Sequence, residues 1–148
     1  MLSYRPAPYH RLPVTAFSPR GWLHRVIELQ AQGLPGTLDT LGEHFPLVAD
    51  SRWLGGEHEM SPETEDAFPM WFNGFLPMAY LLRDPALLER ANAYIDKLLS
   101  MQAADGWAGP VPTINATDDE RTPFEVFCLF HLSNALIQVD DPERNARV

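Results

Sequence analysis

The sequence predicts an all-α fold, and three observations support this class. Helical periodicity recurs along the 148 residues, while strand-like alternation is almost absent. Apolar residues make up 45% of the chain and aromatic residues 11%, which is enough for one domain with its own core. A polar residue that can cap a helix is followed directly by proline at several positions, and this pair is typical of the start of a helix. We therefore expect helices joined by short turns.

The first helix is expected to begin at Ser18, as N-cap, with Pro19 in the first helical position. It should end at Gly33, with Trp22 on the apolar stripe that enters the core. Residues 1–17 are expected to form an extended N-terminal arm. A loop rich in glycine and acidic residues should follow the helix, over residues 34–51.

The next two helices differ in polarity. Residues 70–82 are apolar nearly all round, which indicates a helix buried on most sides. Asp84 and Pro85 are expected to begin the third helix, as N-cap and first helical residue, and it should end near Met101. Its predicted solvent face carries Glu89, Arg90, Asp96 and Lys97. It is therefore expected to be an outer helix.

A fourth helix, from Thr122 and Pro123 to Ile137, is again apolar nearly all round, and this suggests an internal repeat. Asp-Pro pairs at 84–85 and 141–142 each follow an apolar helix, and their prolines are 142 − 85 = 57 positions apart. Stacked helical hairpins of this kind form part of an (α/α)6 toroid. The alternatives are a plain helical bundle and a superhelical hairpin array.

The chain ends where a second outer helix should begin. An inner helix without its covering partner exposes apolar surface. We therefore expect residues 1–148 to be the truncated N-terminal segment of a single (α/α) barrel domain, or to pair with another subunit.

Charge and cysteine content exclude several classes of partner and site. The net charge is −9 and the eleven basic residues are scattered, so neither nucleic acid nor a membrane surface is an expected partner. The single cysteine, Cys128, lies in an apolar run and is expected to be a small buried residue. The dispersed histidines predict no metal site, and His131 is expected to be a core or helix-contact residue. The N-terminus lacks a secretory signal, so we expect a cytoplasmic protein.

The candidate binding residues surround a loop broken by glycine, and their chemistry suits a carbohydrate. Aromatic rings stack on the C–H face of a sugar, and carboxylates accept hydrogen bonds from its hydroxyl groups. In an extended loop Glu57 and Glu59 would point one way and His58 the other. Trp53 and Trp107, both beside glycines, are candidate stacking rings. The alternative is an acidic surface loop before a core helix.

Three further candidates lie at or in the second helix. Asp66 precedes the helix, where capping is the simpler interpretation and substrate binding the alternative. Trp71 is expected to face the same cavity as residues 57–59. A buried Asn73 must find hydrogen-bond partners, so we expect it either to bond a neighbouring loop or to face the cavity.

Taken in order, six segments resemble the N-terminal part of the β-L-arabinofuranosidase family, glycoside hydrolase family 127 and its relatives. The similarity runs from about Leu12 to Val148. It is carried by Pro19-Arg20-Gly21-Trp22-Leu23, Gln30-Ala31-Gln32-Gly33-Leu34, Trp53-Leu54-Gly55-Gly56, Pro69-Met70-Trp71-Phe72-Asn73-Gly74, Ala79-Tyr80-Leu81-Leu82 and Asp105-Gly106-Trp107-Ala108-Gly109-Pro110.

The resemblance implies an (α/α)6 barrel, followed by β-sandwich domains, that acts as a retaining exo-glycosidase on arabinofuranosides. Characterised relatives use a zinc-held cysteine thiolate as nucleophile and a glutamate as general acid/base, both from later in the barrel. Cys128 has no neighbouring cysteine that would make it their counterpart. This chain is therefore expected to hold no cofactor and no catalytic residue, and to be inactive alone. Asp66 and Asn73 depart from the Glu and Asp that relatives often carry, which affects substrate identity more than fold.

A second interpretation assigns no catalytic role. In it the chain is a helical-hairpin interaction module that self-associates, or binds another protein, through exposed inner helices. The first interpretation expects a carbohydrate substrate instead.

Overall fold

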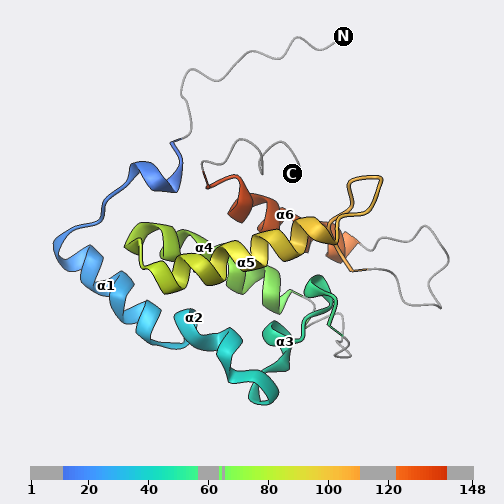
Figure 1. Ribbon diagram of the computed structural model, residues 1–148, viewed down its shortest axis with the longest axis horizontal. Helices are drawn as coiled ribbons and strands as arrows, with labels where there is room; N and C mark the ends of the chain where they lie inside the picture. The colour runs from blue at the N-terminus through green and yellow to red at the C-terminus, as the bar shows by residue number, and fades with distance from the viewer. Residues whose placement is uncertain (1–11, 57–63, 65, 111–122, 140–148) are drawn as a thin grey trace, which may run out of the picture.

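The computed structural model describes residues 12–56, 64, 66–110 and 123–139 (Figure 1). Within these ranges all regular structure is helical, which confirms the predicted all-α class. The elements are η1 (Val14–Ala16), α1 (Gly21–Gln32), α2 (Leu34–Thr37), η2 (Leu38–His44), α3 (Pro46–Ala49), η3 (Arg52–Leu54), α4 (Ala67–Leu82), α5 (Pro85–Ser100) and α6 (Pro123–Leu136).

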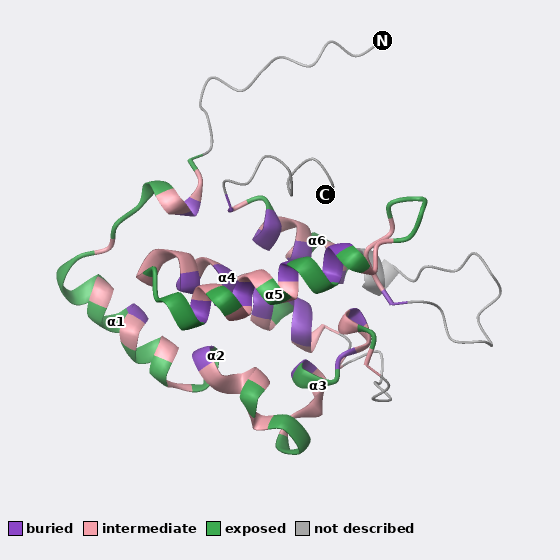
Figure 2. Ribbon diagram, viewed as in Figure 1, coloured by how far each residue is buried: buried purple, intermediate pink, exposed green. Residues whose placement is uncertain are grey.

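Helix α4 forms the centre of the core. Phe68, Phe72, Phe75 and Leu76 are buried almost completely along it, and α1, α5 and α6 all pack against it. Figure 2 shows that buried residues concentrate on α4 and on the faces turned towards it. The prediction that this helix is buried on most sides is confirmed, although it begins at Ala67, three residues before the predicted start.

A tight turn joins α4 to α5. Arg83 adopts a left-handed conformation with φ of 55°, and Asp84 Oδ1 accepts hydrogen bonds from the backbone N–H groups of Ala86 and Leu87, both at 3.0 Å. Pro85 occupies the first turn, as predicted. One face of α5 is buried, with Leu87, Ala91, Ile95, Leu98 and Leu99. The prediction of an outer helix with one solvent-exposed face is therefore confirmed, except at Arg90, which is half-buried in an ion pair.

Helices α4 and α6 run in the same direction. They pack side by side, and η1 contacts α4 and bonds the segment directly after α6. The backbone N–H of Val14 donates to the Gln138 carbonyl at 2.9 Å, and Arg83 Nη2 donates to the Thr15 carbonyl at 3.2 Å. Since α5 returns antiparallel to α4, the three helices run up, down and up.

Several predicted boundaries were wrong. Helix α1 begins at Gly21, with Arg20 rather than Ser18 in the N-cap position. The predicted loop over residues 34–51 contains the short helices α2, η2 and α3, and residues 14–16 of the predicted extended arm form η1. Thr122 and the second Asp-Pro pair lie outside the described residues, so the repeat stays a prediction.

Trp22 is 78% exposed, so its predicted place in the core was wrong. The buried residue of α1 is Ile27, five positions along. At 100° per residue this places the two side chains about 140° apart around the helix axis. Leu23, Val26 and Leu29 are also more than 40% exposed, so most of the predicted apolar stripe lies outside the core. In the part of the chain that the structure describes, no helix is long and apolar enough to cross a membrane.

Candidate functional site

The three residues at the centre of the predicted carbohydrate site, Glu57, His58 and Glu59, lie outside the described residues. Their grouping with Trp71 around one cavity therefore stays a prediction. The other predicted site residues, Trp53, Asp66, Trp71, Asn73 and Trp107, are all described.

Trp53 is a core residue, with only 1% of its surface exposed. Ser51, also fully buried, precedes the turn η3, and its Oγ accepts the Trp53 backbone N–H at 3.3 Å. The Gly56 N–H returns to the Ser51 carbonyl at 3.0 Å, which closes the turn and directs the indole inwards. The ring has no face open to a sugar, so its proposed stacking role does not fit the structure.

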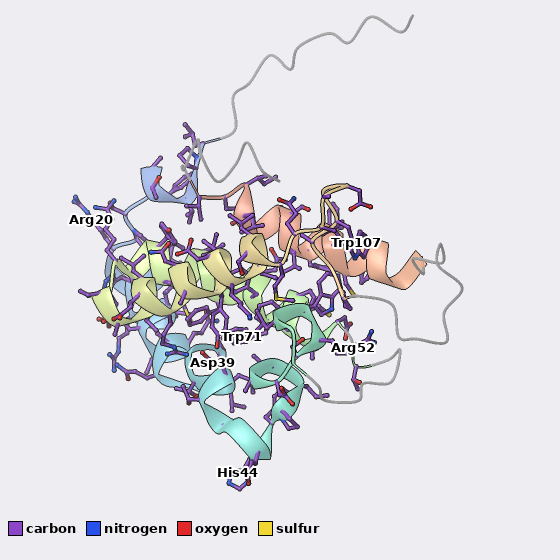
Figure 3. All side chains as sticks on the ribbon, turned by 45° about the vertical axis from the view of Figure 1, so that its right-hand side comes forward. Arg20, Asp39, His44, Arg52, Trp71 and Trp107 are labelled. Carbon is purple, nitrogen blue, oxygen red and sulfur yellow. The ribbon has the colours of Figure 1, made fainter. Side chains whose placement is uncertain are left out.

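Trp107 lies in the turn after α5 and is half-buried (Figure 3). Its Nε1 donates to the Pro110 carbonyl at 3.2 Å, and its backbone N–H donates to Asp105 Oδ1 at 3.0 Å. These bonds hold the indole within its own turn. Some of the ring surface stays accessible, so a stacking role remains a prediction.

Asp66 occupies the N-cap position of α4 but makes no side-chain capping bond. Its φ and ψ of −81° and −7° are helical, whereas a capping side chain needs an extended residue to reach the N2 or N3 amide. The predicted capping role was therefore wrong in geometry. Its carbonyl instead accepts the Met70 N–H at 2.9 Å, as in any helical turn.

Trp71 belongs to an aromatic cluster that α4 and α5 build together. Its indole stacks on Phe75 with ring centroids 4.6 Å apart, and it meets Tyr94 edge-on at 5.6 Å. Its Nε1 donates to the Pro35 carbonyl at 2.8 Å, which connects α4 to the start of α2. The described contacts of Trp71 are therefore to α2, α4 and α5.

A buried ion pair lies beside this cluster, and the sequence did not predict it. The Asp39 side chain is only 3% exposed, and Arg90 of α5 donates to it through Nε, at 3.2 Å, and through Nη2. The Tyr94 hydroxyl donates to Asp39 Oδ2 at 2.9 Å. The Arg90 guanidinium also lies 5.0 Å from the centre of the Phe75 ring. The carboxylate is thus held by three donors from one helix.

The pKa of Tyr94 is raised above its usual value. Burial is the largest cause, and the hydrogen bond to Asp39 and the charge of that carboxylate add to it, while Arg90 opposes it. Tyr94 therefore acts as a neutral hydrogen-bond donor over the whole physiological range.

A second polar group lies between the parallel helices α4 and α6. The Asn134 side-chain amide donates to Asn73 Oδ1 at 2.8 Å, and Asn73 Nδ2 lies 3.5 Å from His131 Nδ1. Asn73 thus bonds a neighbouring helix and not the neighbouring loop of the first alternative. The alternative that it faces the cavity with residues 57–59 stays a prediction. The prediction that His131 contacts another helix is confirmed. We call Asn73, His131 and Asn134 the inter-helix polar group.

Exposed aromatic rings flank the inter-helix polar group. Phe127 and Phe130 are 49% and 66% exposed, and their ring centroids lie 4.7 Å and 5.8 Å from that of His131. Among the described residues His131 Nε2 is a buried nitrogen without a hydrogen-bond partner. The site therefore combines amide and imidazole groups, one of them unsatisfied, with open phenyl rings.

Of this group, only Asn73 was predicted from the sequence to bind substrate. His131 and Asn134 are three positions apart on one helix, which places them on a common face. This spacing was a usable signal, but nothing local showed that the face meets Asn73.

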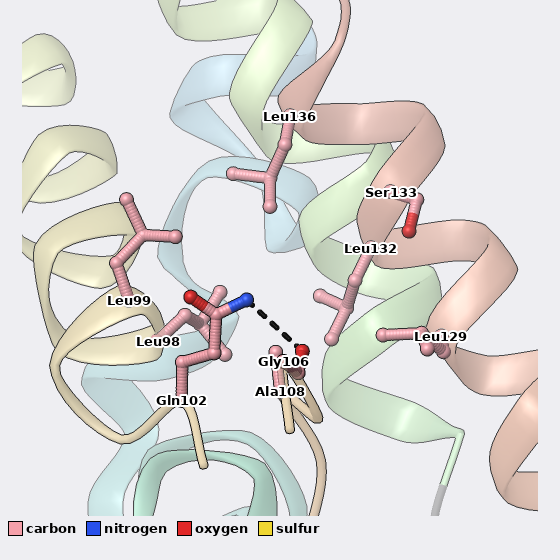
Figure 4. A pocket seen from close by; sticks show the side chains of 9 residues that line it. All are labelled: Leu98, Leu99, Gln102, Gly106, Ala108, Leu129, Leu132, Ser133 and Leu136. Atoms are coloured by element: carbon pink, nitrogen blue, oxygen red, sulfur yellow. Dashed lines mark hydrogen bonds between the residues drawn. The ribbon is translucent and has the colours of Figure 1, made fainter. Parts of the chain in front are cut away.

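A small cavity between the carboxyl end of α5 and α6 offers no comparable chemistry (Figure 4). Its volume is about 50 Å³, far below the 300 Å³ or more that is typical of ligand pockets. Its lining is mainly leucine, and Gln102 Nε2 there donates to the Gly106 carbonyl at 2.9 Å. It is a packing gap rather than a substrate site.

No group of three or more His, Cys, Asp or Glu residues that could hold a metal ion occurs within the described ranges. Cys128 is fully buried on α6, as predicted. No protein-family model, curated protein or solved structure matches this chain.

Proposed function

We propose that this chain forms the N-terminal part of the catalytic (α/α)6 barrel of a glycoside hydrolase that acts on arabinofuranosides or related glycans. In this proposal α4 and α6 are neighbouring inner helices, and α5 is the outer helix between them. The parallel course of α4 and α6 supports it, because successive inner helices of a toroid run in the same direction. A three-helix bundle has the same course, so the functional argument rests on side chains.

The observation that carries the proposal is the inter-helix polar group beside the open rings of Phe127 and Phe130. A sugar presents apolar C–H faces that stack on aromatic rings and hydroxyl groups that exchange hydrogen bonds with amides and imidazoles. A hydroxyl would also satisfy His131 Nε2, once the neighbouring rings turn aside.

The proposed contribution of this chain is substrate binding and not bond cleavage. The Cys128 side chain is enclosed in the core and cannot reach a substrate. Nucleophile and acid/base would come from other parts of the barrel, as the family resemblance implies. The chain alone should therefore bind an arabinofuranoside without hydrolysing it.

Saturation-transfer NMR of the purified chain with methyl β-L-arabinofuranoside tests this proposal. We expect transfer to the sugar protons that decreases strongly in Asn134→Ala, and also in Glu57→Gln and Glu59→Gln. Asn92→Ala is the matched control, because it removes an amide that bonds Tyr80 between α4 and α5. Absence of transfer, or an equal decrease in the control, would contradict the proposal.

A second candidate function is a non-catalytic interaction module that self-associates through its exposed helices. Phe127 and Phe130 of α6, and Ile137 directly after it, are each more than 40% exposed, as are Trp22 and Leu29 of α1. Apolar patches of this kind mark interaction surfaces. Sedimentation of the wild-type chain and of Phe130→Ser tests it: we expect oligomers that dissociate in the variant. A cooperatively melting monomer at every concentration would refute it.

A further inference from the structure

Residues 34–45, which comprise α2 and η2, form a segment with little apolar anchoring, and we call them the strap. No large apolar residue among them is fully buried, since Leu38 and Phe45 are only partly buried against the core. The elements on either side are better anchored, through Ile27 of α1 and Val48 of α3. Hydrophobic burial therefore holds the two ends of this region more firmly than its middle.

Polar contacts to α4 and α5 replace that burial. Arg90 and Tyr94, one helical turn apart on α5, both donate to Asp39, and Arg90 Nη2 also donates to the Gly36 carbonyl at 3.0 Å. From α4, the Trp71 indole donates to the Pro35 carbonyl at 2.8 Å. All these contacts fall on residues 35–39, close to Trp71 (Figure 3).

We propose that the strap is a lid over Trp71, fastened by the Asp39–Arg90–Tyr94 cluster, which opens as one unit while α1, α4 and α5 remain folded. Segments with few buried apolar contacts open locally, at a free energy below that of global unfolding. Opening would free the indole Nε1, which in the closed form donates to the Pro35 carbonyl. This proposal stands independently of the carbohydrate-binding function.

Hydrogen exchange followed by mass spectrometry tests the proposal on the intact chain. Asp39→Asn removes the negative charge to which Arg90 and Tyr94 both donate. The backbone amides of residues 34–45 should therefore exchange about tenfold faster or more. Amides in the middle of α4 and α5 should keep their wild-type rates. Glu43→Gln, an exposed carboxylate on the same strap, is the matched control and should change neither.

Equal acceleration in the strap and in α4 and α5 would show that the cluster supports global stability alone, and would overturn the proposal. Unchanged exchange in the strap would overturn it as well. If Asp39→Asn does not fold, Tyr94→Phe decides the question, because it removes one donor and keeps the ring packing. It should give the same localised pattern with a smaller acceleration.

Discussion

Replacing Tyr94 with phenylalanine tests the energetics of the buried Asp39 carboxylate in solution. The variant deletes one hydroxyl that donates to Asp39 at 2.9 Å, and keeps a ring that packs against Phe68, Trp71 and Phe72. A hydrogen bond to a charged group contributes about 1.5–3 kcal/mol. Because Arg90 still donates to Asp39 through two nitrogens, we expect a loss near the lower limit, about 1.5 kcal/mol.

The same hydroxyl predicts a dependence on pH. Since the pKa of Tyr94 is raised in the folded chain, the unfolded chain loses this proton first as the pH rises above the usual value of 10.0. The stabilisation from Tyr94 is complete below that pH and decreases above it. For a group that titrates only in the unfolded state, the decrease is about 1 kcal/mol between about pH 10 and pH 11.

Urea denaturation of wild type and Tyr94→Phe, followed by circular dichroism, measures both effects. Titration of Lys97 and of the other three tyrosines contributes to both chains, so it cancels in the difference between their free energies of unfolding. It should be constant from about pH 7 to pH 9 and should shrink above pH 10. A difference that is absent at neutral pH, or that does not change up to pH 11, would refute the assigned hydrogen bond and its burial.

Two further predictions concern the helix contacts. Asn73→Ala removes the acceptor for Asn134 within the inter-helix polar group, and should lower the free energy of urea unfolding by about 1–3 kcal/mol; an unchanged value would mean that water already satisfies these groups. Gly36→Ala should destabilise by about 1–3 kcal/mol, because a Cβ there would overlap the Ala31 backbone. Gly74→Ala is its control, because a Cβ there meets open space within α4. Calorimetry should show that this variant raises the free energy of unfolding by about 0.5–1 kcal/mol. A change of the same sign in both variants would contradict the close approach of α2 to α1.

The long helices could be predicted because their signals are local. Asp84 and Pro85 specify the start of α5 by side-chain geometry alone, and the buried positions of α5 follow its three- and four-residue spacing. The start of α1 was missed because Ser18 and Pro19 provide the usual cap pattern while the helix begins at Gly21. A cap motif shows where a helix can begin, but tertiary contacts decide where it does.

The site could be predicted only in part, because its partners are distant in the sequence. Arg90 was assigned to the wet face of α5 on charge alone, yet it bonds Asp39, 51 residues earlier. Trp53 was chosen for its glycine neighbours, but the same glycines let the chain fold back and bury the ring. Aromatic and charged residues are ambiguous in sequence, since burial of a ring or pairing of a charge depends on which element the fold brings opposite.

The Asp39–Arg90–Tyr94 cluster and the inter-helix polar group have different surroundings. The surroundings of the first suit it to stabilising the fold, and those of the second suit it to the ligand binding proposed above. Asp39 is enclosed and receives three donors, so its hydrogen-bonding capacity is largely used within the chain. His131 has one nitrogen near Asn73, the other without a partner among the described residues, and exposed phenyl rings beside it. A ligand gains most where polar atoms are positioned but unsatisfied. Under the proposed function, the α4–α6 junction, and not the ion pair under the strap, is therefore the surface on which a sugar should be sought first.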